Sequence, residues 1–155
     1  MRQSEESSGG LEETTIRVES FLRTLAHETG SEGLTPIVIG AGLEERYPEL
    51  TVLAQVAELP VLRAQNRSPD EIALELVSRW GTRSAIFAGL EEEVGRYVPV
   101  FESAQIATRV ITPNNAAQAI LLILARATGL EETTLAAREG FGRFVEDVSA
   151  LARQL

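Results

Sequence analysis

Apolar and polar positions follow two alternating patterns along this chain. Short apolar runs, of the kind that form strands buried on both faces, are separated by longer stretches with apolar residues at helical spacing. Strands that alternate with helices predict an α/β fold with a mostly parallel sheet and flanking helices. The predicted strands lie within Thr35 to Gly42, Pro60 to Ala64, Arg83 to Gly89 and Ile106 to Thr112. An all-helical fold is the alternative, but it leaves the first and third of these runs unexplained.

The helical stretches are bounded by residues that commonly start or end helices. Ser68 is a suitable N-cap with Pro69 in the first helical position, and Asn115 is a second N-cap. Gly81 and Gly129 are suited to ending a helix. The predicted helices cover 10–29, 43–59 with an interruption at Pro48, 68–81, 90–104 with a break near Pro99, 116–129, and 130–155 loosened around Gly140 and Gly142. Alternatively, the segment around Pro99, "YVPVF", is an edge strand.

The tetrapeptide Gly-Leu-Glu-Glu occurs four times, beginning at Gly10, Gly42, Gly89 and Gly129. The two inner copies lie in segments with the same order of strand, helix, strand, polar loop and helix. We therefore predict an internal repeat of residues 35–81 and 83–129 within a single α/β domain that covers 11–155. Residues 1–10 are polar and predict a disordered lead-in.

Gly-Leu-Glu-Glu has the chemistry of a strand-to-helix or helix-start signal. Glycine allows a tight turn, and glutamates in a first helical turn face the positive end of the helix dipole. A phosphate cradle is the alternative at Gly40-Ala41-Gly42, but Glu45 stands where a dinucleotide fingerprint needs its third glycine. A metal site built from the glutamates is a further alternative, although adjacent glutamates on a helix do not face each other.

Composition excludes several classes of function. The net charge of −9 disfavours nucleic acid and anionic membrane surfaces. The absence of Cys rules out disulfides and thiolate metal sites, and a single histidine, His27, rules out a multi-histidine metal site. All the basic residues are Arg, so this chain offers no Schiff-base lysine and no P-loop lysine. We expect no metal and no cofactor.

No apolar run reaches the length of a transmembrane helix, and the first residues lack the apolar segment of a signal peptide. We therefore expect a cytoplasmic protein that does not bind membranes.

The best candidate for a ligand site is the loop after the second predicted strand. Asn66 and Arg67 lie at the carboxyl end of that strand and just before a helix, where α/β sheets place ligands. Such a pair can bind a small anion together with the helix N-terminus. The alternative is a turn followed by an N-cap. His27 is expected at a helix end, and Trp80 in the core or at an interface.

The segment from Pro60 to Val94, "PVLRAQNRSPDEIALELVSRWGTRSAIFAGLEEEV", resembles the DRTGG domain, a small α/β regulatory module. Asn66-Arg67 stands where that family has Asp-Arg, and Phe87-Ala88-Gly89 stands where it has Thr-Gly-Gly. The resemblance covers a third to a half of the chain. It implies a non-catalytic, dimeric regulatory module, with Asn66, Arg67 and Gly89 as its ligand-binding residues.

We therefore expect a non-enzymatic regulatory or ligand-sensing module that forms a homo-oligomer. A structural or assembly protein that binds a protein partner through apolar helical faces, around "AILLILA" and Trp80, is the second hypothesis. An enzyme that uses carboxylates or Arg ranks last.

Overall fold

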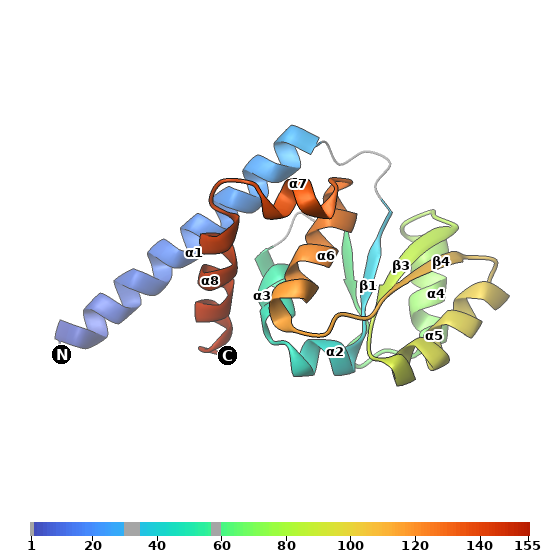
Figure 1. Cartoon of the computed structure of the whole chain (residues 1–155). Helices are drawn as coiled ribbons and strands as arrows, with labels where there is room; N and C mark the ends of the chain where they lie inside the picture. Colours follow the sequence, from blue (N-terminus) through green and yellow to red (C-terminus); the bar gives the residue numbers. More distant parts are fainter. Residues whose placement is uncertain (1, 30–34, 57–59) are drawn as a thin grey trace.

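The computed structural model describes residues 2–29, 35–56 and 60–155 and shows an α/β architecture (Figure 1). Helices and strands alternate along most of the chain, as the apolar pattern predicts. The strands are β1 (Ile37–Ile39), β2 (Val61–Arg63), β3 (Ser84–Ala88) and β4 (Ala107–Ile111). The helices are α1 (Arg2–Thr29), α2 (Ala41–Arg46), α3 (Glu49–Val56), α4 (Pro69–Ser78), α5 (Glu91–Ser103), α6 (Ala116–Thr128), α7 (Glu132–Ala136) and α8 (Phe141–Ala152).

The four strands form one sheet in the order β2-β1-β3-β4, and all neighbouring pairs are parallel. The central strand β1 pairs with both β2 and β3, so that Ile37 lies beside Val61 on one side and Ile86 on the other. This confirms the predicted parallel sheet. The chain leaves β1 toward one edge of the sheet and later leaves β3 toward the opposite edge.

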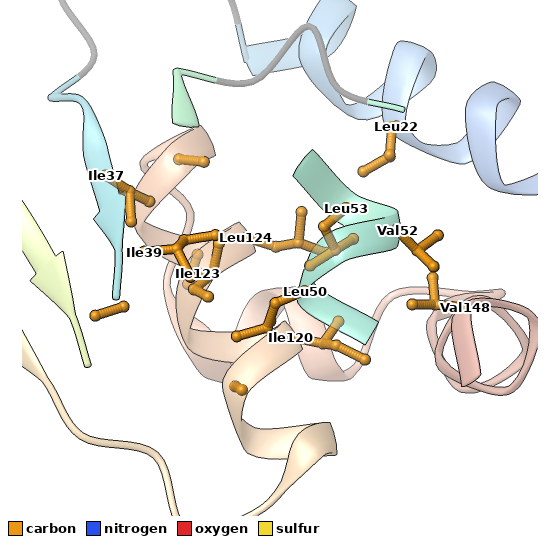
Figure 2. Close-up of a cluster of buried hydrophobic side chains, with 14 of the residues drawn as sticks. Leu22, Ile37, Ile39, Leu50, Val52, Leu53, Ile120, Ile123, Leu124 and Val148 are labelled. Carbon is orange, nitrogen blue, oxygen red and sulfur yellow. The ribbon is translucent and has the colours of Figure 1, made fainter. Parts of the chain in front are cut away.

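Each face of the sheet carries its own layer of helices and its own apolar core. Figure 1 shows α3 and α6 on one side of the strands and α4 and α5 on the other. Figure 2 shows the first core, where Leu50 and Leu53 of α3 and Ile120 and Ile123 of α6 lie against β1. These four side chains are fully buried. Ile37 and Ile39 of β1 belong to this first core, and Val38 belongs to the core on the other face. Successive residues of β1 therefore face different helices, as expected for a strand buried on both sides.

The second core, under α4 and α5, is built around aromatic rings. Phe87 of β3 stacks on Tyr97 of α5 with ring centroids 4.9 Å apart, and Phe101 meets both rings edge-on. Ile72 and Leu76 of α4 complete this core.

A further pair of helices, α1 and α8, lies outside α3 and α6. Val148 of α8 meets Val52 of α3 at this boundary, and Leu22 of α1 points into the same cluster (Figure 2). Arg17 of α1 donates two hydrogen bonds to Asp147 of α8, from Nε at 3.0 Å and from Nη2 at 3.1 Å. These bonds raise the pKa of the Arg17 guanidinium above its ordinary value, and they fix the two terminal helices to each other.

The first half of the proposed repeat contains β1, α2, α3, β2 and α4, and the second contains β3, α5, β4 and α6, so the single helix α5 stands in place of α2 and α3. The crossover helices of the two halves, α3 after β1 and α5 after β3, lie on opposite faces of the sheet. A two-fold axis parallel to the strands, between β1 and β3, would place them in this way. The arrangement is compatible with a duplication, which stays a prediction.

The predicted helix break at Pro99, and the alternative edge strand there, are wrong. Helix α5 runs through Pro99 without interruption. A proline inside a helix removes one hydrogen-bond donor and crowds the carbonyl four residues earlier, which here belongs to the exposed Gly95. Tyr97 and Phe101, on either side of Pro99, are both buried in the second core, so tertiary packing keeps the helix continuous.

The predicted helix start at Gly10 is also wrong, because α1 begins at Arg2 and overlaps the predicted lead-in of residues 1–10. The first Gly-Leu-Glu-Glu copy therefore lies inside a helix. Glycine lowers helix stability by about 1 kcal/mol but keeps the backbone donor that the helix needs. The predicted final residues of the helix after Pro48, 57–59, lie outside the described residues. Among the described helices, none combines the length and the apolar character needed to cross a bilayer.

Candidate functional site

The carboxyl ends of β1 and β3 form the point at which the chain direction across the sheet reverses. Open α/β sheets bind ligands at such a point, in the crevice beyond the strand ends. Here Gly40, Ala41 and Gly42 follow β1, and Gly89 and Leu90 follow β3. The first residues of α2 and α5 therefore face each other across the reversal.

A side chain of the protein itself occupies this position. The carboxylate of Glu93 accepts hydrogen bonds from the backbone N–H groups of Gly42 (2.8 Å, to Oε2), Leu43 (3.1 Å, to Oε1) and Leu90 (3.0 Å, to Oε1). The first two donors belong to the start of α2, and the third lies at the start of α5. One buried carboxylate therefore satisfies free N–H groups at two helix N-termini.

Gly40 allows this close approach. A Cβ atom at position 40 would lie 2.6 Å from Oε1 and 2.8 Å from Cδ of Glu93, which no real side chain could tolerate without displacing the carboxylate. Because Glu93 is 2% exposed, its carboxylate has no open space into which to move. The backbone donors that a phosphate would need are thus already bound, which agrees with the sequence argument against a phosphate cradle at Gly40-Ala41-Gly42.

A second carboxylate pairs with an arginine beside β1 and β2. The Nε of Arg63, at the end of β2, donates to Glu44 Oε1 at 3.0 Å, and its Nη2 donates to Glu44 Oε2. The hydroxyl of Thr51 also donates to Glu44 Oε2, at 3.0 Å. The hydrogen bond to Glu44 raises the pKa of the Arg63 guanidinium above its ordinary value, which favours its charged form. Arg63 Nη2 donates further to Gln65 Oε1 at 2.7 Å.

These residues line an open cleft of about 480 Å³ at the carboxyl edge of the sheet. Its wall carries charge of both signs, from Arg63 and Glu45, and the amides of Gln65 and Asn66. Asn66 has a φ of 61°, in the left-handed region that asparagine adopts more easily than most residues. The lining residues are Ala41, Glu44, Glu45, Pro48, Thr51, Arg63, Gln65, Asn66 and Leu155.

Of the three predicted ligand-binding residues, Asn66 lines this cleft and Arg67 faces elsewhere. The Arg67 guanidinium donates from Nη1 to Glu75 Oε2 of α4 at 3.0 Å. Its backbone carbonyl accepts a hydrogen bond from the Tyr97 hydroxyl at 3.1 Å. Burial raises the pKa of Tyr97, so the hydroxyl keeps the proton that it donates. Arg67 therefore connects β2 to α4 and α5.

Gly89, the third predicted residue, lies at the end of β3 and does not line the cleft. Its N–H continues the sheet by donating to the carbonyl of Ile111 at 3.1 Å. A Cβ at this position would lie 2.4 Å from the ring of Phe87, so glycine is required by packing. Asn66, Arg63 and Glu44 thus line the same cleft at the edge of the sheet, whereas Gly89 is not among its lining residues.

Glu44, Arg63 and Glu93 were not among the site residues predicted from the sequence. Arg63 is a charged residue in an otherwise apolar strand, which is a usable signal for an internal ion pair. Glu93 follows the third Gly-Leu-Glu-Glu copy, and nothing in its neighbours distinguishes it from Glu91 and Glu92.

The other singled-out residues lie outside this region. His27 is exposed in the last turn of α1, and Trp80 is 37% exposed just after α4. Within the described residues, no group of three or more His, Asp or Glu side chains is placed to hold a metal ion.

Comparison with protein-family models, with curated proteins and with solved structures gives no match for this chain.

Proposed function

We propose that this chain is a non-catalytic ligand-sensing module that binds a small polar molecule in the cleft at the carboxyl edge of its sheet. The observation that carries the proposal is the ion pair of Glu44 and Arg63 on the wall of this cleft. Glu44 is buried and fully partnered, while the Arg63 side chain remains 34% exposed. A fixed, partly exposed guanidinium of this kind is a preorganised binding group.

The charged side chains at this edge of the sheet are engaged in hydrogen bonds within the protein, which supports a regulatory role over catalysis. Glu93 is bound to backbone N–H groups, Glu44 to Arg63, and Arg67 to Glu75. A general base or nucleophile must be able to reach substrate. These side chains instead hold the strand ends and helix starts together.

The chemistry of the cleft favours a small zwitterion as the ligand. Arg63 offers a partner for a carboxylate, and Glu45 is exposed and forms no ion pair within the described part of the chain. The amides of Gln65 and Asn66 add donors and acceptors. A cleft of about 480 Å³ is in the range of small-molecule sites. The alternative is the small anion that the sequence predicts at Asn66 and Arg67.

Thermal unfolding in the presence of ligands tests the proposal. The panel consists of amino acids, simple carboxylates, inorganic phosphate, acyl phosphates and nucleotides. A ligand at about 100 times its dissociation constant adds about 2.7 kcal/mol, which raises the melting temperature by about 5–10 °C in a chain of this length. We expect a zwitterion to give this shift.

Two variants assign the shift to the cleft. Glu45→Gln removes the exposed charge, and Asn66→Gly removes the amide while keeping a residue that tolerates positive φ. Both should reduce the shift. Asn114→Gly, the same change in the exposed loop after β4, is the matched control and should leave it intact. A shift that survives both cleft variants contradicts this site, and a shift from phosphate alone favours the anion.

The second hypothesis is an assembly protein that binds a partner through apolar helical faces. The "AILLILA" surface expected from the sequence does not serve this role. The "AILLILA" segment lies in α6, whose Ile120, Ile123 and Leu124 are fully buried in the first core. It is covered by α1, α3 and the sheet. Trp80 remains partly exposed just after α4.

A further inference from the structure

Helices α4 and α5 leave a groove between them on the outer surface of the second helical layer. The groove has a volume of about 680 Å³ and lies on the side of these helices that faces away from the first core. Its walls are mainly apolar. The lining residues are Asp70, Ala73, Leu74, Val77, Arg83, Pro99, Val100, Ser103 and Ala104.

The α4 wall of the groove is one continuous helical stripe. Asp70, Ala73, Leu74 and Val77 are spaced i, i+3, i+4 and i+7, which places their side chains on one side of the helix. Leu74 is 68% exposed, the largest exposed fraction among the large apolar side chains of the described residues. Leu74 therefore adds exposed apolar surface to the apolar wall of the groove, and contiguous apolar surface of this kind marks interaction sites.

Two charged residues mark the ends of the groove. Asp70 lies in the first turn of α4, and Arg83 lies beyond the other end of that helix, just before β3. Neither forms an ion pair within the described residues. Arg83 donates one hydrogen bond, from Nη1 to the carbonyl of Ala104 at 2.8 Å, which fixes its guanidinium at the rim.

We propose that this groove is the interface of a homodimer in which two copies of the chain pack α4 and α5 face to face and antiparallel. A two-fold interface requires a surface that complements itself. If residue i of one copy contacts residue j of the other, then residue j of the first copy also contacts residue i of the second. Asp70 of each copy would meet Arg83 of the other at both ends of the contact. Leu74 of each copy would enter the apolar groove of the other.

A second copy of the chain fits these features. A groove with an acidic end, an apolar middle and a basic end matches its own reversed image, and electrostatic complementarity of this kind fixes the register of an interface. This proposal does not depend on the ligand cleft, which lies at the carboxyl ends of β1 and β2 and shares none of these residues.

Sedimentation velocity over a range of concentrations tests the interface. The wild-type chain should form a dimer, and Leu74→Glu should weaken the dimer by roughly 100-fold or more, because each dimer contains two copies of the buried side chain. Ile16→Glu on α1, where Ile16 is 63% exposed, is the matched control and should leave the dimer unchanged. Far-UV circular dichroism verifies that each variant is folded.

Charge exchange tests the antiparallel arrangement. Asp70→Arg alone places two arginines together, and Arg83→Asp alone places two aspartates together, so each variant should lose self-association. Mixed in equal amounts, the two variants should form a heterodimer, because Arg at 70 then meets Asp at 83 and Asp at 70 meets Arg at 83. The double variant should again form a homodimer.

Each contrary result overturns a stated part of this proposal. A wild-type chain that stays monomeric at every concentration overturns the dimer. A dimer that Leu74→Glu leaves intact overturns the α4 and α5 surface. A dimer lost in Leu74→Glu but indifferent to the charge exchanges overturns the antiparallel pairing.

Discussion

At the scale of single residues, Glu93 has the most consequential position in this chain. Its carboxylate is the shared acceptor for N–H groups of α2 and α5, and it lies where a related architecture would hold a ligand's phosphate. The N-terminal donors of two helices, on either side of the sheet reversal, are thereby satisfied without water or ligand. The Glu93 carboxylate therefore has a structural role, as the acceptor for backbone N–H groups of the same chain.

We predict that Glu93→Gln lowers the free energy of unfolding by about 2–4 kcal/mol, because a neutral amide loses the charge-assisted bonds and points an NH₂ group at backbone donors. Urea denaturation measures the change. Glu92→Gln, at the exposed neighbouring glutamate, should change stability by less than about 0.5 kcal/mol. Equal effects of the two variants would show that the buried hydrogen bonds carry no special weight.

Tyr97 predicts how stability responds to alkaline pH. Burial raises its pKa in the folded state above the unfolded value of about 10, so its contribution is complete below about pH 10 and is lost as the pH rises further. The chain has no Lys and no Cys, so its two tyrosines are the side chains that titrate there.

We therefore expect the free energy of unfolding to fall above about pH 10, and to fall less in Tyr97→Phe. At neutral pH the same variant should be about 1 kcal/mol less stable, because it lacks the hydrogen bond to the Arg67 carbonyl. Denaturation at a series of pH values measures both effects, with Tyr47→Phe as the control. An unchanged alkaline decline in Tyr97→Phe would refute the assignment.

At the scale of helices and strands, the sequence predicted helix boundaries correctly where a capping side chain or a glycine ends the helix locally. Ser68 accepts from the N–H of Glu71, and Asn115 accepts from the N–H of Gln118, as N-caps do. Gly129 ends α6 in the left-handed conformation. The prediction failed at Pro99, because the burial of Tyr97 and Phe101 outweighs the local preference of proline.

The two N-caps occupy equivalent places in the two halves of the chain, before α4 and before α6. We predict that Ser68→Ala and Asn115→Ala each cost about 1 kcal/mol, since each leaves one helical N–H without its side-chain acceptor. Thermal or urea denaturation of both variants measures this. Ser20→Ala, at an exposed position of α1, should be close to neutral. A cost confined to one cap would show that the halves differ energetically.

At the scale of the whole molecule, the fold class could be predicted from the sequence, whereas only Asn66 of the candidate site could. Four apolar runs between helices are enough to indicate a parallel sheet, because strands buried on both faces have a distinct composition. The site depends on pairs that are far apart in sequence, such as Gly42 with Glu93 and Glu44 with Arg63. Local patterns carry no information about which strand ends become neighbours, so the partners of these carboxylates emerged only with the strand order.

The two cores provide a test of whether the predicted single domain unfolds as one unit. We expect Ile123→Val in the first core and Phe101→Leu in the second each to cost about 1 kcal/mol, and their effects to add within about 0.5 kcal/mol, because the sheet separates the sites. One urea transition should describe the double variant. Two separate transitions would indicate that the helical layers unfold independently.

The contact between Gly40 and Glu93 also has an evolutionary consequence. Because a Cβ at position 40 would collide with the carboxylate, the two positions are expected to change together among descendants of a common ancestor. Lineages that replace Glu93 with a smaller residue would leave the backbone donors of Gly42, Leu43 and Leu90 without their acceptor, and a side chain at position 40 would then no longer meet a carboxylate.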